Sequence, residues 1–161
     1  MIVISDTGPL NYLILTDSIH VLPAIFGEVY APPEVMAELK RSRRRELEPV
    51  RRWAKSPPRW LTVRGPAEID QTLPAKLGRG EVEAISLAKE LGADKTLLDD
   101  RDARKAAKER CLDVVGTLGI LEEAARRGLI DIEQKITELK KTTFRASEIL
   151  YQSVLDRVRV L

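Results

Sequence analysis

The chain has 161 residues, of which 43% are hydrophobic and 32% are charged, and its formal net charge is +2. This length predicts a single domain over residues 1–161 with a core of its own, and the composition excludes a disordered chain. Cys111 is the only cysteine, which excludes an intramolecular disulfide and argues against a cysteine-based zinc site. No signal-like or membrane-spanning apolar segment is evident, so we expect a cytoplasmic protein.

The predicted elements begin with a short apolar strand at residues 2–4, and Asp6-Thr7-Gly8-Pro9 ends it. Pro9 suits the first turn of a helix that carries Leu10, Leu13 and Ile14, and we expect this helix to continue past Asp17. The next elements are a helix at 21–26, a strand at 28–31, a helix opened by Pro33, a basic helix at 46–55 and a strand at 60–63.

The second half continues the alternation after a loop at residues 65–80. The predicted elements are a helix at 81–91 ended by Gly92, a strand at 96–98, a helix at 103–110, a strand at 112–115 and helices at 118–127, 132–141 and 147–158. Strands that alternate with helices predict a three-layer α/β/α fold with a central parallel sheet. The helices from about residue 131 form a C-terminal addition to that pattern.

Two predicted strands end in acidic residues. The first strand delivers Asp6, and the strand at 96–98 delivers Asp99 and Asp100. In a parallel sheet, ligands bind beyond the carboxyl ends of the strands, where these carboxylates would gather. Clustered carboxylates are costly without a cation, and Mg²⁺ or Mn²⁺ prefers oxygen ligands. One of the two adjacent acids should face the site while the other holds the following loop.

Two helices offer further acids. Glu81 heads an apolar stripe of Ala84, Ile85 and Ala88, so its carboxylate can reach the strand ends. The alternative role for Glu81 is to complement the helix dipole from the first turn. Considered without the other acids, Glu81 fits this alternative better than a role in the site. Glu38 follows Val35 by one turn and is a weaker candidate on spacing.

Two threonines follow strand ends and are candidate supporting residues. Thr7 and Thr117 can hydrogen-bond a metal-bound carboxylate or a phosphate, although an N-cap role fits their positions better. Asp102 is interpreted as the cap of the helix that follows it.

Basic residues gather between Lys40 and Arg59, where nine positive charges face only two acids, Glu46 and Glu48. Such a cluster can contact phosphates, but a solvated helix face explains it equally well. The residues that we single out for nucleic-acid binding are Arg43, Arg44, Arg45, Arg51 and Arg52.

Four motifs, in order, resemble those of PIN-domain nucleases. They are Asp6-Thr7-Gly8-Pro9-Leu10, Gly80 to Ile85, Leu98 to Arg104, and Gly116 to Gly119. The resemblance spans about residues 1–130 and extends to toxins of VapC-like toxin–antitoxin pairs, which cleave RNA. It implies metal-site roles for Asp6, Glu38, Glu81 and Asp100. Here Leu98 stands where the family has Thr and Asp99 is an additional acid, so the choice between Asp99 and Asp100 stays open.

Residues and resemblance together predict a Mg²⁺- or Mn²⁺-dependent ribonuclease that hydrolyses phosphodiester bonds. Asp6, Glu81 and Asp99 or Asp100 would bind the metal, and Glu38 would complete the site or orient the water. RNA is the expected substrate, with an antitoxin protein and a second copy of the chain as further partners. The alternatives are an inactive PIN-like module that binds RNA or protein, and an aspartyl phosphatase or phosphotransferase that uses Asp6 as nucleophile.

Overall fold

The computed structural model describes residues 1–160 and contains a five-stranded, all-parallel sheet. The strand order is β3-β2-β1-β4-β5, so the first strand of the chain lies at the centre. The strands are β1 (Val3–Ser5), β2 (Val29–Ala31), β3 (Leu61–Val63), β4 (Lys95–Leu97) and β5 (Val114–Val115).

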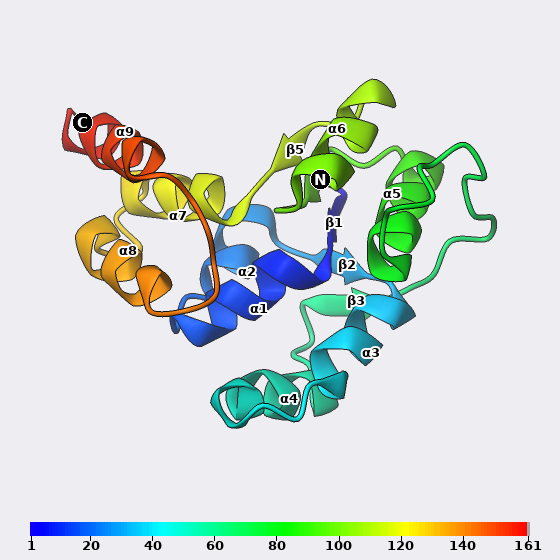
Figure 1. Cartoon of the computed structure of the whole chain (residues 1–161), viewed down its shortest axis with the longest axis horizontal. Coiled ribbons are helices and arrows are strands. Elements are labelled where there is room, and N and C mark those ends of the chain that lie inside the picture. Colours follow the sequence, from blue (N-terminus) through cyan, green and yellow to red (C-terminus); the bar gives the residue numbers. More distant parts are fainter. Residues whose placement is uncertain (161) are drawn as a thin grey trace.

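Helices connect the strands and cover both faces of the sheet (Figure 1). Up to β5 they are α1 (Thr7–Leu15), α2 (Val21–Phe26), α3 (Pro33–Arg41), the 3₁₀ turn η1 (Arg45–Leu47), α4 (Glu48–Lys55), α5 (Arg79–Leu91) and α6 (Arg101–Glu109). After β5 follow α7 (Thr117–Arg126), α8 (Ile132–Lys140) and α9 (Glu148–Arg159). The predicted three-layer α/β/α arrangement is confirmed.

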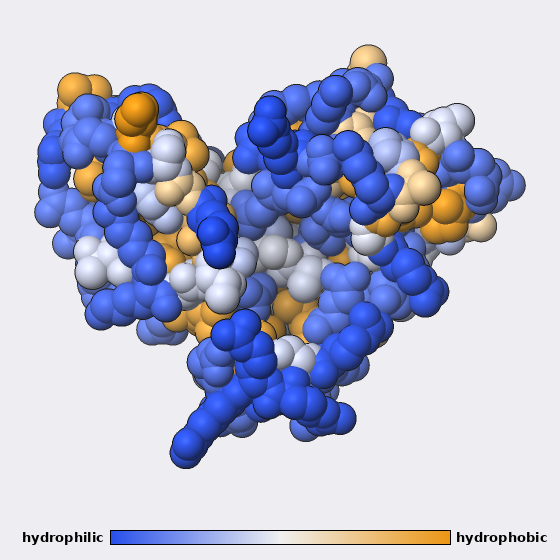
Figure 2. Space-filling view, viewed as in Figure 1, coloured by the Kyte–Doolittle hydropathy of each residue, from blue (hydrophilic) through white to orange (hydrophobic). Residues whose placement is uncertain are grey.

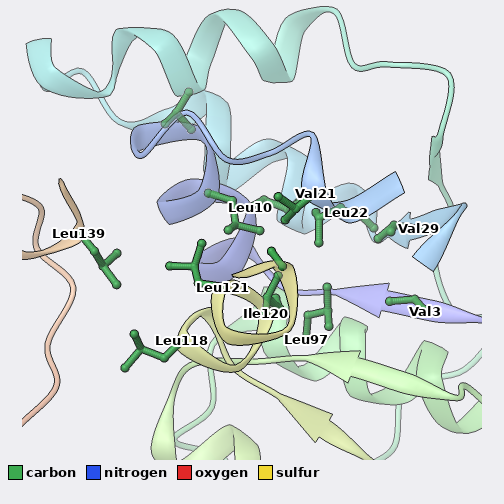
Figure 3. Close-up of a cluster of buried hydrophobic side chains, with 14 of the residues drawn as sticks. Val3, Leu10, Val21, Leu22, Val29, Leu97, Leu118, Ile120, Leu121 and Leu139 are labelled. Atoms are coloured by element: carbon green, nitrogen blue, oxygen red, sulfur yellow. The ribbon is translucent and has the colours of Figure 1, made fainter. Parts of the chain in front are cut away.

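Alternation along β1 distributes the core between the two faces, because successive strand residues point to opposite sides. Val3 packs with Leu10 and Leu121 in the larger cluster, which holds residues of α1, α2 and α7 (Figure 3). Ile4 packs with Leu87 of α5 on the other face. The rigid centre of the molecule therefore lies directly behind the end of β1.

Several predicted boundaries differ from the structure, among them those of the first helix, the basic helix and the strand before Asp99. Helix α1 ends at Leu15, before Asp17, whose φ of 50° is left-handed and does not continue a right-handed helix. The predicted basic helix is divided into η1 and α4. Strand β4 ends at Leu97, one residue earlier than expected, so two residues separate its end from Asp100. The predicted stop at Gly92 is confirmed, with a φ of 62°.

The C-terminal helices α8 and α9 pack beside α7, on the side of the molecule away from α5 (Figure 1). The side chain of Ser147 caps α9 by accepting a bond from the amide of Leu150 (3.1 Å), as its position before that helix predicts. Between residues 1 and 160, no helix is both long and apolar enough to cross a membrane.

Candidate active site

The sheet brings Asp6 and Asp99 to one edge of the fold. Strand β1 pairs with β4 so that Ser5 lies opposite Leu97, and the amide of Asp6 donates to the carbonyl oxygen of Leu97 (3.0 Å). Both acids therefore follow neighbouring parallel strands at their carboxyl ends. The prediction from strand ends places these two residues correctly.

Asp6 is buried without a full set of partners. The residue is 6% exposed, and its Oδ1 atom has no hydrogen-bond partner among the described residues. Asp6 occupies the N-cap position of α1, but its side chain makes no capping bond. A buried carboxylate oxygen with no partner is costly, so a purely structural role does not explain it.

Burial raises the pKa of Asp6 to about 8, from an ordinary value of 3.8. A hydrogen bond from the Thr7 backbone acts against this rise, and the charges of Glu81, Glu38 and Asp99 add to it. The four carboxylates thus interact electrostatically. Without a cation, Asp6 holds its proton at neutral pH because ionisation would add a charge to an acidic, poorly solvated site.

Glu38 comes from α3 and is held at the start of α5. Its Oε2 atom accepts a short bond from the Thr7 hydroxyl, and its Oε1 atom accepts from the Gly80 amide (3.2 Å). A Cβ atom on Gly80 would lie only 2.7 Å from Oε1, so the glycine makes room for this carboxylate. Thr7 therefore bonds a site acid, and its interpretation as an N-cap is wrong, because Asp6 occupies the cap position.

Glu81 combines the two roles considered for it. Its Oε1 atom accepts from the Gly78 amide (2.8 Å) and closes the first turn of α5, which is the capping role. Burial raises the pKa of the Glu81 carboxyl, and the neighbouring Asp100 and Glu38 raise it further, while the Gly78 bond acts against them. The same side chain caps its helix and takes part in the acidic cluster.

The sequence predicts that one of Asp99 and Asp100 faces the site and that the other holds the following loop. In the structure, both face the cluster, and Asp100 also holds the loop. Asp99 accepts from the Thr117 amide at Oδ1 and from the Thr117 hydroxyl at Oδ2, both at 2.7 Å. Thr117 therefore bonds a site acid, and its N-cap interpretation is wrong, because Gly116 is the cap of α7. Burial raises the pKa of Asp99, against the Thr117 bonds and the charge of Arg104.

Asp100 is exposed and caps α6, because its Oδ2 atom accepts from the Ala103 amide (3.0 Å). Asp100 also raises the pKa of Glu81, so this one residue both faces the cluster and holds the following loop. The prediction that Asp102 caps this helix is wrong: Asp102 lies within α6 and pairs with Lys76 (3.2 Å). The cap falls on Asp100 because α6 begins two residues earlier than expected.

The acids fit a divalent cation in their chemistry. They offer carboxylate oxygens, which Mg²⁺ and Mn²⁺ prefer, and the unpartnered Oδ1 of Asp6 is buried among them. As the side chains stand in residues 1–160, no three Asp, Glu, His or Cys residues are grouped closely enough to hold an ion. Hydrogen bonds from Thr7, Gly78 and Thr117 hold the acids apart, so binding would require side-chain adjustment.

The basic residues singled out from the sequence separate into three kinds. The Arg51 side chain donates to the carbonyl oxygens of Ser42 and Arg44, both at 2.7 Å, and so fixes the turn before α4. Arg52 and Arg44 form ion pairs with Glu48 (2.5 Å) and Glu46 (2.6 Å). Within the described part of the chain, Arg43 and Arg45 are exposed and form no ion pair.

Two residues beside the acids were not singled out from the sequence. Gly80 gives room to Glu38, and Arg104 lies next to Asp99, where a Cβ atom on Gly116 would come within 2.8 Å of its guanidinium and 3.2 Å of the carboxylate. For Gly80, the signal is a second glycine shortly after Gly78, directly before the predicted helix at 81–91. For Arg104, the signal is its position one turn after Asp100, which directs it back toward the strand end.

A cavity of about 810 Å³ opens beside this site. Asp6, Asp99 and Asp100 line one end of it, and residues of α7, α9 and the segment between α8 and α9 line the other. The acids are therefore reachable from a space of the size that binding sites for small ligands have.

Residues 2–159 match a protein family described as a PIN domain. A comparison with curated proteins gave no match.

Proposed function

The chain belongs to the PIN-domain family, whose members are generally nucleases that use divalent metal ions, and we propose that it is a metal-dependent ribonuclease. The observation that carries the proposal is Asp6: it is buried, keeps one oxygen without a partner and lies among Glu38, Glu81 and Asp99. A hard cation would relieve that arrangement, because it neutralises the repelling carboxylates.

In this proposal Asp6 and Glu81, with Asp99 or Asp100, hold Mg²⁺ or Mn²⁺, which when bound supplies an activated water and a Lewis acid for the phosphate. The chain's own residues set the geometry around it. Thr117 fixes both oxygens of Asp99 through two bonds of 2.7 Å, and each oxygen keeps a lone pair for a further partner.

Glu38 is the residue that we assign to orienting the attacking water or accepting its proton. Thr7 and the Gly80 amide hold its carboxylate in place, so little side-chain freedom is lost when a reactant binds. Its charge acts on Asp6 and on Glu81, which places it at the cluster without making it a required metal ligand.

The remaining assignments extend the proposal to partners. RNA is the substrate, and Arg43 and Arg45 are the cations of the basic segment best able to contact its phosphates. A VapC-like toxin role, with an antitoxin protein as partner, follows from the motifs in the sequence. A second copy of the chain could pack on the C-terminal helix α9, where Ile149 is 80% exposed. The proposal places the protein in the cytoplasm and treats residues 1–161 as one domain.

One alternative loses support from the space around Asp6. An aspartyl phosphatase would carry a second acid two residues later, where this chain has Gly8. A Cβ atom on Gly8 would lie 3.0 Å from Oδ2 of Asp99, so a side chain there would require the Asp99 carboxylate to shift. An inactive module that binds RNA or protein is the second candidate, because no three acids of residues 1–160 are grouped closely enough to hold an ion.

The test is cleavage of an end-labelled RNA by wild-type protein and by Asp6→Asn, with and without Mn²⁺. We expect wild-type cleavage only with metal and a loss of about 10³-fold in Asp6→Asn, since metal assistance is worth several kcal/mol. Asp102→Asn is the matched control and should cleave normally, because Asp102 pairs with Lys76 outside the cluster. Metal-dependent cleavage by Asp6→Asn at the wild-type rate would exclude this site, and no cleavage by wild type would favour the inactive module.

A further inference from the structure

Building on the proposed function, we propose that the cavity beside the carboxylates is a nucleotide subsite. Phe144 would contact one unpaired base of the substrate strand there, and Arg104 would contact the adjoining phosphate. The protein would then recognise the nucleotide next to the cleaved bond as well as the bond itself.

The cavity lies between two parts of the molecule. Arg101 and Arg104 of α6 and Val114 and Val115 of β5 line one side, while Phe144, Leu150 and Val154 on and before α9 line the other. The outline of the molecule is notched between these parts in the space-filling view (Figure 2). At about 810 Å³, the space is within the range of cavities that enclose small ligands.

An aromatic pair forms part of its wall. The rings of Tyr12 and Phe144 meet at 83°, with centroids 5.1 Å apart, and both residues line the cavity. The Tyr12 hydroxyl also lies 2.9 Å from the Thr143 hydroxyl, which ties the segment before α9 to α1. Aromatic rings on a fixed segment provide stacking or edge contacts that every base can use.

Cations lie at the end of the cavity nearest the acids. Arg104 is half-buried beside Asp99, yet in residues 1–160 it forms no ion pair within 4 Å, and neither does Arg145 on the opposite wall. Arg157, by contrast, is bound to Glu122 (2.7 Å). Because no carboxylate of the described residues pairs with it, the Arg104 guanidinium is available for a phosphate.

Acids, cations and aromatic rings line the same cavity, and a nucleotide is the ligand that can contact all three kinds of group. Three of the acids proposed to act on the phosphodiester bond, the Arg104 cation and the aromatic pair all line a single cavity. A base that is stacked and paired in a duplex cannot enter such a space, whereas a base of a single strand can. The subsite therefore predicts a preference for single strands that depends on Phe144.

The experiment measures binding with cleavage disabled. In the Asp6→Asn background, fluorescence anisotropy would compare a short single-stranded RNA with versions that lack the base at one position, moved along the strand. We expect the loss of one particular base to weaken binding about 10-fold, as base stacking on an aromatic ring predicts. Phe144→Leu should weaken binding of the intact RNA equally and should not weaken binding of that abasic RNA further.

The control variants separate the effect of the Phe144 ring from general effects of a Phe-to-Leu change and from the effect of the Arg104 charge. Phe144→Tyr should keep the affinity, and Phe26→Leu, on α2, should not change it. Arg104→Gln should weaken binding of intact and abasic RNA by the same factor. Equal effects of Phe144→Leu on both RNAs, or equal binding of duplex and single strand, would overturn the subsite while leaving the nuclease proposal intact. No binding of any RNA, together with no cleavage by wild type, would overturn both.

Discussion

Two aspartates, Asp6 and Asp70, have opposite surroundings. Asp6 is 6% exposed and Oδ1 of its carboxylate has no partner in the described structure, while acids surround it. Asp70, in the loop before α5, is partly buried and accepts bonds from Lys89 (2.8 Å), Arg110 (2.8 Å) and both the amide and hydroxyl of Thr72 (2.9 and 2.5 Å).

The comparison shows how a structural carboxylate differs from a functional one. Hydrogen bonds from Lys89, Thr72 and Arg110 hold the pKa of Asp70 well below its usual range, so its charge stabilises the loop. Burial and like charges raise the pKa of Asp6 to about 8, so its charge opposes folding until a cation balances it. The carboxylate surrounded by donors stabilises the fold, whereas the buried carboxylate with an unpartnered oxygen among acids is the candidate site residue.

The largest expected effect is on the pH dependence of stability in EDTA. The folded protein keeps a proton on Asp6 that the unfolded chain releases above about pH 4, so the free energy of unfolding should fall by several kcal/mol as pH rises from 4 to 8. Glu81 and Asp99, whose pKa values are also raised, add to this fall.

Asp70 acts with the opposite sign, because its contribution is present above about pH 4 and is lost as pH falls below it. Denaturant titrations between pH 3 and 8 measure both effects. Asp6→Asn should flatten the fall between pH 4 and 8, and Asp70→Asn should reduce the loss on the acid side. A flat wild-type profile between pH 4 and 8 would contradict the assignment of Asp6.

The next effect concerns stability at pH 7. Asp70→Asn should lower the free energy of unfolding by about 2–3 kcal/mol, because bonds to Lys89 and Arg110 lose their charged acceptor. Asp6→Asn should leave the stability of the metal-free protein unchanged or raise it, because folding at pH 7 no longer requires proton uptake at this position. Thermal melts of both variants in EDTA measure the pair, and a destabilised Asp6→Asn would mean that Asp6 is structural.

Metal addition should sharpen the contrast. At a Mn²⁺ concentration 100 times the Kd, wild-type protein should gain about 2.7 kcal/mol of stability, and Asp70→Asn should gain as much. Asp6→Asn should gain clearly less, since it removes a proposed ligand. Melting curves across a Mn²⁺ titration give the result. An equal gain in all three proteins would place the bound ion elsewhere.

A smaller effect separates the threonines that serve the two aspartates. Thr117→Val and Thr72→Val each remove a hydroxyl that donates to a carboxylate, and each should cost about 1 kcal/mol of stability. Only Thr117→Val should also slow RNA cleavage, because Thr117 positions Asp99. Unchanged cleavage by Thr117→Val would make that bond a packing feature like the one at Asp70.

The smallest effect on stability belongs to cations that lack partners. Replacing both Arg43 and Arg45 with Ala should change the free energy of unfolding by less than about 0.5 kcal/mol. It should also flatten the salt dependence of RNA binding, because fewer counterions are released. Arg127→Ala is the control, since Arg127 pairs with Glu123 (2.9 Å). An unchanged salt slope would leave Arg43 and Arg45 as a solvated surface.

The sequence was informative where apolar runs end in charged residues. Asp6 and Asp99 could be placed at one sheet edge because two buried strands precede them, and the family resemblance added Glu38, which spacing alone supports weakly. The roles of Thr7 and Thr117 were misread, because capping preferences are local and their carboxylate partners come from α3 and from the end of β4.

Other features could not be predicted because they depend on contacts distant in sequence. The loop at 65–80 has no periodicity, yet Asp70 anchors it through Lys89 and Arg110. Asp100 caps α6 in place of the predicted Asp102, because α6 begins two residues earlier than expected. Arg104 and Phe144 became candidates only once α6, α7 and the segment before α9 were seen to share a cavity.

The strand order has a consequence for translation. Strand β1 is synthesised first but lies at the centre of the sheet, and its neighbour β4 begins only at Lys95. Asp6 is therefore synthesised well before Glu38, Glu81 and Asp99. Thr117, whose bonds fix Asp99, is synthesised later still. At about 5–20 residues per second, several seconds of synthesis separate the first acid from the last. The candidate site therefore stays incomplete in the nascent chain until Asp99 has been synthesised.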